Sequence, residues 1–215
     1  MTIDVLVADD HAIIRDGLRK ILGDTVDLRV AGEAADAQQV VEHVRARDWG
    51  LVVLDMSMPG RSGLELIKQL KAERPRLHIL VFSMHPEEQY AVRAIRAGAS
   101  GYLSKETDSD MLLPAMRKVA SGGAFVSSKV AELLAMDTSH ESERPAHSLL
   151  SDREWGVFAR IVRGASLTEI GEELCLSIKT VSTHKSHILT KMNLANQVDM
   201  VRYAIDHGLI DTARE

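Results

Sequence analysis

The sequence lacks the long hydrophobic runs of membrane proteins and nearly lacks cysteine. Its longest apolar stretches have the length of a strand, far short of the roughly 20 residues that cross a bilayer. Met1 leads almost directly into the first of them, so we expect no signal peptide and a cytoplasmic protein without a membrane partner. The single cysteine, Cys175, excludes an internal disulfide, and its neighbours Leu174 and Leu176 predict a buried, small hydrophobic side chain.

An excess of positive charge is also missing. The formal net charge of -5 at pH 7 disfavours nucleic acid as a partner if the chain is taken as a whole. Between residues 176 and 192, however, no acidic residue occurs and five basic or imidazole side chains gather: Lys179, His184, Lys185, His187 and Lys191. Because DNA phosphates meet only a local surface, this stretch predicts a helix face that can contact DNA.

The length of 215 residues favours two domains. From residue 3 to about 120, short apolar runs alternate with segments of helical period, and the last such helix, near 109–121, contains Pro114, which should shorten it at its start or kink it. The runs predict strands near residues 3–8, 28–34, 51–55, 78–83 and 101–104. This alternation predicts an α/β fold, a doubly wound five-stranded parallel sheet.

The second half of the chain has only helical patterns. After a helix near 127–136, residues 137–147 contain no apolar residue larger than alanine and predict a flexible linker. We therefore expect domains at 1–122 and 148–215, joined by a helix and linker over 123–147. The helices of the second domain are predicted near 151–164, 167–174, 177–192 and 196–207. The short joint at 175–177 predicts a helix-turn-helix in an all-α four-helix DNA-binding domain.

Five acid, hydroxyl or ammonium side chains follow the ends of the predicted strands: Asp9, Asp10, Asp55, Ser83 and Lys105. Since the carboxyl ends of parallel strands meet at one edge of a sheet, where such sheets bind ligands, we expect these groups to lie together. Clustered carboxylates favour Mg²⁺ together with a phosphate oxygen. Asp55 could then attack phosphorus as a nucleophile. Lys105 would pair with the transferred group and Ser83 would donate a hydrogen bond to it.

These residues resemble the motifs of a known family. Asp9-Asp10, Asp55 followed by Met-Ser-Met-Pro-Gly, Ser83 and Lys105 resemble the flavodoxin-like receiver domain of bacterial two-component response regulators. The pattern that runs from Leu150-Ser-Asp-Arg-Glu to Leu174-Cys-Leu-Ser-Ile-Lys-Thr-Val-Ser-Thr-His resembles the LuxR-type DNA-binding domain. Together they are similar to the NarL/FixJ class of transcription regulators.

The resemblance implies that Asp55 accepts a phosphoryl group from a sensor histidine kinase, so that the protein is a switch rather than an enzyme with turnover. It implies that Mg²⁺ is held by Asp10, Asp55 and the backbone carbonyl of Ser57, with Asp9 acting through a bound water. Ser83 and Tyr102 would be the switch pair, in which the hydroxyl moves toward the phosphate and the ring turns inward.

For the second domain, the resemblance implies that residues 178–192 lie in the major groove of double-stranded DNA. The candidate contacts to phosphates or base edges are Lys179, Thr180, Thr183, His184, Lys185, His187 and Lys191. A second copy of the chain is an expected partner on repeated half-sites, and RNA polymerase is a further candidate.

Two alternatives stay open from the sequence. An Asp-nucleophile phosphohydrolase would use the same carboxylates, Mg²⁺ and lysine, but such enzymes place a second acid two residues after the nucleophile, where this chain has Ser57. The phosphohydrolase alternative would also leave the predicted helix-turn-helix without a role. The other alternative is a DNA-binding regulator that phosphorylation does not control.

Overall fold

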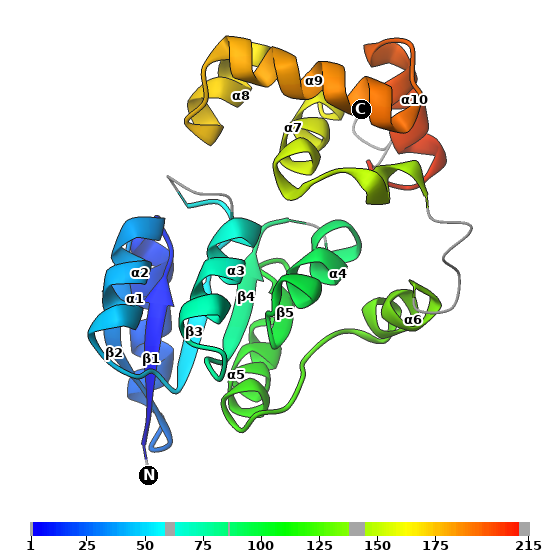
Figure 1. Cartoon of the computed structure of the whole chain (residues 1–215). Coiled ribbons are helices and arrows are strands. Elements are labelled where there is room, and N and C mark those ends of the chain that lie inside the picture. Colours follow the sequence, from blue (N-terminus) through cyan, green and yellow to red (C-terminus); the bar gives the residue numbers. More distant parts are fainter. Residues whose placement is uncertain (1, 59–62, 86, 138–144, 211–215) are drawn as a thin grey trace. The chain divides into compact units, whose positions relative to one another are not determined.

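Two compact units, Met1–Met136 and Asp137–Glu215, make up the protein (Figure 1). The computed structural model describes residues 2–58, 63–85, 87–137 and 145–210. Within them, no helix combines the length and the apolar character that a membrane span requires.

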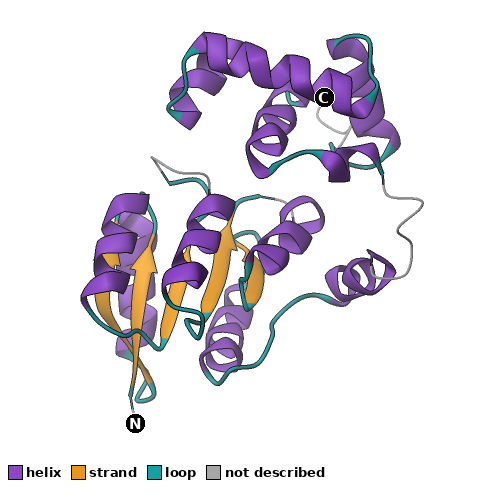
Figure 2. Cartoon of the chain, viewed as in Figure 1, coloured by secondary structure: helices purple, strands orange, loops and turns teal. Residues whose placement is uncertain are grey.

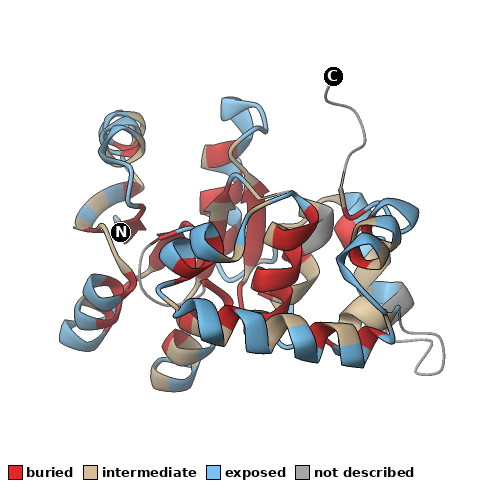
Figure 3. Cartoon of the chain, turned by 90° about the horizontal axis from the view of Figure 1, so that it is seen from above, coloured by how far each residue is buried: buried red, intermediate tan, exposed pale blue. Residues whose placement is uncertain are grey.

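The first unit contains five parallel strands in the order β2-β1-β3-β4-β5. The strands are β1 (Ile3–Ala8), β2 (Leu28–Ala34), β3 (Leu51–Leu54), β4 (Ile79–Ser83) and β5 (Gly101–Ser104). The central strands are buried along most of their length, as the mostly red strands in Figure 3 show. Such uninterrupted Val- and Leu-rich runs are typical of parallel strands that helices cover on both faces. The predicted doubly wound five-stranded sheet is confirmed.

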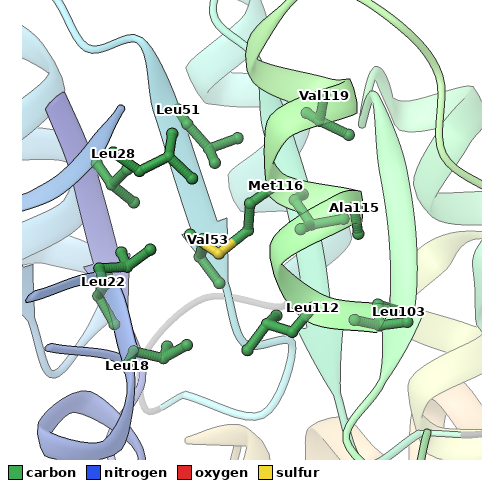
Figure 4. Packing of buried hydrophobic residues seen from close by; sticks show 13 residues of the cluster. Leu18, Leu22, Leu28, Leu51, Val53, Leu103, Leu112, Ala115, Met116 and Val119 are labelled. Atoms are coloured by element: carbon green, nitrogen blue, oxygen red, sulfur yellow. The ribbon is translucent and has the colours of Figure 1, made fainter. Parts of the chain in front are cut away.

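Helices cover the two faces of this sheet (Figure 2). They are α1 (Ala12–Gly23), α2 (Ala37–Ala46), α3 (Gly63–Glu73), α4 (Glu87–Ala97) and α5 (Leu112–Ala120). A core cluster joins α1 and α5 to one face, with Leu22 and Met116 packed over Val53 (Figure 4). Helices α2, α3 and α4 pack side by side on the other face.

Pro114 lies in the first turn of α5, which begins at Leu112 directly after the short 3-10 helix η1 (Ser109–Met111). Of the two effects predicted for this proline, a shorter helix start and a kink, the structure shows the first, since the α-helix begins at Leu112 and not near residue 109. Proline fits the first turn because the backbone N–H that it lacks has no partner inside the helix there.

The chain after α5 extends the sheet beyond β5, a feature that the sequence analysis did not predict. Phe125 forms a parallel bridge with Gly101, and the backbone N–H of Tyr102 donates to the Phe125 carbonyl at 2.9 Å. Helix α6 (Ser128–Asp137) follows, and its Val130 is fully buried. This helix therefore belongs to the first unit up to Met136. Of the predicted linker 137–147, residues 138–144 lie outside the described residues, so the predicted domain boundaries stay predictions.

The second unit is helical throughout its described part, which confirms the predicted all-α four-helix domain. Its elements are the 3-10 helix η2 (Ala146–Leu149), α7 (Asp152–Val162), α8 (Leu167–Leu174), α9 (Ile178–Met192) and α10 (Gln197–Asp206). Ser151 and Ser166 close capping boxes at the starts of α7 and α8, and Ser177 caps α9. The core side chains include Trp155, Phe158, Ile170, Val181, Ile188 and Met200.

The turn between α8 and α9 corrects one prediction. Cys175 is exposed and not buried, and it takes the left-handed conformation with φ 53° at the end of α8. Its backbone reverses the chain so tightly that a Cβ on Gly171 would come within 2.8 Å of the Leu176 carbonyl. Leu174 turns into the core, while the side chain of Cys175 points to the surface. The apolar neighbour Leu174 therefore indicated the buried face of α8, but it did not indicate the environment of Cys175 in the turn that follows.

Candidate functional site

The strand order reverses between β1 and β3, and the candidate residues follow these two strands. Asp9 and Asp10 come after β1, and Asp55 comes after β3. The backbone N–H of Asp55 donates to the Ala8 carbonyl at 2.8 Å, which fixes the two strand ends side by side. In open α/β sheets the reversal of strand order creates a crevice at the carboxyl ends of the strands, where ligands bind.

Lys105 joins the carboxylates of this edge. Its Nζ lies 2.6 Å from Asp9 Oδ2 and 2.9 Å from Asp55 Oδ2. All three groups are buried, because Asp9 and Asp55 are 2% and 3% exposed and the Lys105 side chain is 6% exposed. Burial alone would lower the pKa of Lys105, but the hydrogen bonds and charges of Asp9 and Asp55 hold this pKa above its ordinary value. Lys105 is therefore a cation at neutral pH, and it lies between two carboxylates.

Asp10 lies beside this group and is more open to solvent. His11 Nδ1 lies 2.9 Å from Asp10 Oδ1 and 3.3 Å from Asp9 Oδ1. One potential ligand atom each from Asp9, Asp10, His11 and Asp55 lies within 4.8 Å of the other three. The carboxylate oxygens of this set fit Mg²⁺, which prefers oxygen ligands. The sequence analysis missed His11, although its position directly after Asp9-Asp10 is a signal that could have found it.

Ser57 and Arg15 support the carboxylates through backbone groups. The Ser57 N–H donates to Asp55 Oδ1 at 3.2 Å. Ser57 therefore lies next to the carboxylates, which is necessary if its backbone carbonyl is to be a Mg²⁺ ligand. Arg15 Nη1 donates to the Asp9 carbonyl at 2.7 Å, and Arg15 Nε donates to Glu33 at 3.2 Å. Arg15 therefore fixes the Asp9 loop to β2, and nothing in the sequence marked it out.

The two predicted switch residues hold the same short segment. The hydroxyl of Ser83, which is fully buried, accepts from the His85 N–H at 3.3 Å. The hydroxyl of Tyr102 donates to the His85 carbonyl at 2.8 Å. The Tyr102 ring is fully buried, which raises the pKa of its hydroxyl, so the ring already lies inside in this structure. The His85 ring stacks on Tyr90 of α4 with a 4.3 Å centroid distance. The hydroxyls of Ser83 and Tyr102 are thus both connected to α4 through His85.

Helix α9 carries all the candidate DNA contacts of the second unit. Lys179, Thr183 and His187 are exposed, and Thr180 and His184 are partly buried. The Thr180 hydroxyl also contacts the capping Ser177 hydroxyl at 2.7 Å. Lys185 Nζ donates to Gln197 Oε1 at 2.7 Å, and this neutral partner does not offset the charge of the lysine.

Lys191 differs from these residues because its charge is used inside the unit. Its Nζ lies 2.7 Å from Glu154 Oε2, and Glu154 is only 4% exposed. The same carboxylate accepts hydrogen bonds from the Ser151 N–H and hydroxyl. Burial opposes ionisation of Glu154, but Lys191 and Ser151 hold its pKa below the ordinary value. The phosphate contact that the sequence analysis expects of Lys191 is untested, and the geometry gives this lysine a partner inside the unit.

Comparison with known proteins divides the chain at the same two units. Residues 5–117 match the family described as "Response regulator receiver domain", and residues 148–204 match "Bacterial regulatory proteins, luxR family". The Response regulator UvrY of Escherichia coli K12 is 35% identical over 209 residues, covering 96% of this chain and 95% of UvrY. The Oxygen regulatory protein NreC of Staphylococcus carnosus is 33% identical over 214 residues, covering 96% of this chain and 99% of NreC.

Solved structures give the same result. RcsB of Salmonella typhimurium is similar with a TM-score of 0.70 and 27% identity, covering 95% of this chain and 98% of RcsB. RcsB of Salmonella enterica serovar Typhimurium bound to promoter rprA in the presence of phosphomimetic BeF3- has a TM-score of 0.67 and 27% identity, covering 94% and 98% of the two chains. Another structure contains two RcsB dimers bound to two parallel DNAs.

Proposed function

The chain belongs to the transcription-regulating response regulators of the NarL/FixJ class, with a receiver domain and a LuxR-type DNA-binding domain, and we propose that phosphoryl transfer to Asp55 controls its binding to DNA. The observation that supports this proposal best is the buried contact of Lys105 with Asp9 and Asp55 where the strand order reverses. The family is not one of classical enzymes, and its match over nearly the whole chain sets the phosphohydrolase alternative aside.

The proposed chemistry is a transfer between two side chains. A carboxylate oxygen of Asp55 attacks the phosphorus of a phosphohistidine on a sensor histidine kinase. The P–N bond breaks as the P–O bond forms, so the kinase regains its histidine and Asp55 becomes an acyl phosphate. Lys105 Nζ, now 2.9 Å from Asp55 Oδ2, is in place to pair with an oxygen of the transferred group. Later hydrolysis of the acyl phosphate restores the carboxylate.

A divalent cation fits this reaction because three carboxylates converge where an anionic phosphoryl group must approach. Asp10, Asp55 and the Ser57 carbonyl would hold Mg²⁺, and Asp9 would act through a bound water. When bound, the ion offsets the negative charge of the carboxylates and the phosphoryl group. Lys105 alone supplies one positive charge to Asp9 and Asp55, which leaves the more exposed Asp10 to attract the ion.

The proposed switch follows from the contacts of His85. If the Ser83 hydroxyl turns to a phosphoryl oxygen, it no longer accepts from the His85 N–H. The Tyr102 hydroxyl then remains the side-chain group that holds the His85 carbonyl, and the ring of His85 stacks on α4. Phosphorylation would therefore change the surface formed by α4, β5 and the segment of Phe125 that pairs with β5.

For the second domain, we propose that α9 enters the major groove, with Lys179 and Lys185 on phosphates and with Thr183, His184 and His187 near phosphates or base edges. Thr180 at the start of the helix is a further candidate. Two copies of the chain would bind repeated half-sites, as the dimers of RcsB on DNA suggest by analogy. Such a regulator would work in the cytoplasm, and RNA polymerase is the further partner that an activating regulator would contact.

The test uses DNA selected by the protein itself. The full chain is treated with acetyl phosphate and Mg²⁺, duplexes are selected from a random pool, and the dissociation constant of a selected duplex is measured by fluorescence anisotropy. We expect treated protein to bind about tenfold more tightly than untreated protein, and Asp55→Asn to show no difference between the two conditions. Equal affinities of treated and untreated wild-type protein would show that phosphorylation does not control DNA binding.

A further inference from the structure

A cavity of about 440 Å³ lies at the amino ends of β3 and β4, at the edge of the sheet opposite to Asp55. It is lined by the last turns of α2 and α3 and by the loops that lead from these helices into β3 and β4. Its volume is within the range of roughly 300–1,000 Å³ that small-molecule sites occupy. Neither the phosphoacceptor site nor the proposed DNA contacts use any of the residues that line it.

We propose that this cavity binds a small organic anion, in which a carboxylate or phosphate group is joined to an apolar or aromatic body. The arginines of the rim would bind the anionic group, and the apolar wall would contact the body. The site does not depend on phosphoryl transfer to Asp55, so it goes beyond the proposed function.

The rim of the cavity carries an excess of positive charge, although the chain as a whole has a formal net charge of -5. Three arginines and two acids line it: Arg47, Arg74, Arg76, Asp48 and Glu73. A local excess of one charge inside a concave surface attracts ions of the opposite sign. The rim therefore favours an anion, provided that the two acids do not offset the arginines.

The two acids leave most of this positive charge in place. Arg45 binds Glu73 through two hydrogen bonds of 2.8 and 2.7 Å. Hydrogen bonds from Arg45 and Gln69 lower the pKa of Glu73 to about 2, so this carboxylate is ionised and already paired outside the three rim arginines. Asp48 Oδ1 lies 3.9 Å from Arg74 Nε, and because the Asp48 side chain is 94% exposed, water screens this contact.

Arg76 and Arg47 have guanidinium groups that an anion can reach. Arg76 is exposed, and among the described residues it has no hydrogen-bonding or charged partner. Arg47 Nη2 lies 3.2 Å from Asp4 Oδ2, but Asp4 also binds Arg29 at 2.6 Å, so one carboxylate is shared by two arginines. Guanidinium groups bind carboxylates and phosphates through two parallel hydrogen bonds. These two arginines are therefore the anion ligands that we expect.

Trp49 places an apolar surface beside these cations, and Val44 and Leu77 extend this apolar wall of the cavity. Trp49 Nε1 donates to the His43 carbonyl at 2.9 Å, which fixes the orientation of the ring. The Arg47 guanidinium lies over the same ring, 3.9 Å from its centroid. Trp49 therefore positions Arg47 through a cation–π contact and joins a cation to an apolar surface, the combination that an organic anion requires.

The two sides of the cavity are held together by the chain itself. The pair of Arg45 and Glu73 joins the end of α2 to the end of α3. Arg74 donates to the carbonyls of Val44 and Arg45 at 3.3 and 3.4 Å. Lys71 Nζ donates to two backbone carbonyls of the loop before β4, at 2.5 and 2.9 Å. A cavity that is formed in advance loses little conformational entropy when a ligand binds.

The test titrates four probes into the full chain without Mg²⁺. Phenylphosphonate and benzoate carry an anionic group on an aromatic body, whereas inorganic phosphate is the anion alone and benzyl alcohol is the body alone. Isothermal titration calorimetry gives the dissociation constants, and the fluorescence of Trp49 locates the binding. Trp49→Phe, which retains only Trp155, is the control for that signal. We expect phenylphosphonate to bind about tenfold more tightly than inorganic phosphate, because its ring leaves water, and benzyl alcohol not to bind.

Variants of exposed arginines identify the ligands. We expect Arg47→Gln and Arg76→Gln each to weaken phenylphosphonate binding about fivefold. Arg202→Gln, which removes an exposed arginine of α10, is the control with the same change of charge, and it should leave the dissociation constant unchanged. Asp55→Asn should leave it unchanged as well. Circular dichroism checks that each variant is folded.

The outcomes decide whether the site exists. Binding of only one of phenylphosphonate and benzoate, with the expected loss in Arg76→Gln, would support the site and identify its anionic group. If inorganic phosphate binds as tightly as phenylphosphonate, or if Arg202→Gln weakens binding as much as Arg76→Gln, the attraction is unspecific and the proposal is overturned. The absence of binding heat and of a change in Trp49 fluorescence would overturn it too. Loss of binding in Asp55→Asn would move the probe to the phosphoacceptor site and also contradict the proposal.

Discussion

At the scale of single residues, Lys105 determines how two carboxylates can be buried beside each other. Asp9 and Asp55 are nearly inaccessible to solvent, and both contact the Lys105 ammonium below 3 Å. Burying an unpaired charge is expensive, so we expect the cation to stabilise the folded state as well as to serve the chemistry.

We predict that Lys105→Met lowers the free energy of unfolding by about 3 kcal/mol in the absence of Mg²⁺, because it leaves two buried carboxylates without their cation. Saturating Mg²⁺ should reduce this loss, since the ion supplies positive charge to the same group. Urea denaturation with and without Mg²⁺ measures both effects. Lys20→Met on the exposed side of α1 is the matched control. A stability of Lys105→Met equal to that of the control would refute this role.

The raised pKa of Lys105 has a consequence for alkaline stability. A raised folded-state pKa means that the contribution is fully present below the unfolded-state pKa of about 10.4 and is lost as pH rises through the folded-state value. The difference in unfolding free energy between wild type and Lys105→Met should therefore be constant at neutral pH and shrink only above about pH 10.

Cys175 is the second residue at which we predict how substitutions change the free energy of unfolding. Its φ of 53° lies in the region that L-residues avoid and glycine tolerates. Cys175→Gly should raise the free energy of unfolding by up to about 1 kcal/mol, whereas Cys175→Val should lower it by about 1 kcal/mol, because a β-branched side chain fits this conformation poorly. Urea denaturation of the three proteins gives the order, and the reverse order would contradict the left-handed turn.

At the scale of elements, α9 combines two kinds of lysine. Lys179 is exposed at the start of the helix, while Lys191 near its end binds the buried carboxylate of Glu154 on α7. We expect the first to act on DNA and the second to join α9 to α7. Their positions twelve residues apart on one helix make them a natural pair for comparison.

We predict that Lys179→Met reduces the slope of log affinity for DNA against log salt by about 0.9 and leaves stability unchanged, since one phosphate contact is lost. Lys191→Met should leave the slope unchanged and lower the free energy of unfolding by about 1 kcal/mol, a modest value because solvent screens the partly exposed lysine. Anisotropy over a salt series and urea denaturation report the two quantities. If Lys191→Met reduces the slope as much as Lys179→Met, Lys191 is also a phosphate contact.

The lowered pKa of Glu154 adds a pH dependence to the same comparison. A lowered folded-state pKa gives stability that is present above the unfolded-state value of about 4.3 and is lost as pH falls through the folded-state value. The stability difference between wild type and Lys191→Met should therefore disappear in acid, which urea denaturation at a series of pH values can follow.

At the scale of the whole molecule, the sequence predicted elements better than contacts. Apolar periodicity located the five strands to within about one residue, because this signal is local. It did not predict that Phe125 pairs with β5 or that Lys191 binds Glu154, since such pairs join residues that are distant in sequence. Cys175 was assigned to the wrong environment because a turn interrupted the helical pattern.

For the candidate site, too, one part could be predicted from the sequence and another part could not. That Asp9, Asp55 and Lys105 lie together was predictable because parallel strands end at one edge of the sheet. His11 could have been found from its position directly after Asp9-Asp10, whereas the contact of Arg15 with the Asp9 carbonyl depends on a side-chain direction in α1 that periodicity does not predict.

The most direct test of the account is the mass of the intact protein after treatment with acetyl phosphate and Mg²⁺, measured for wild type and for Asp55→Asn. We predict that wild-type protein gains the mass of one phosphoryl group and that Asp55→Asn gains none. An unmodified wild type, or an equal gain on Asp55→Asn, would contradict the assignment of Asp55 as the phosphoacceptor.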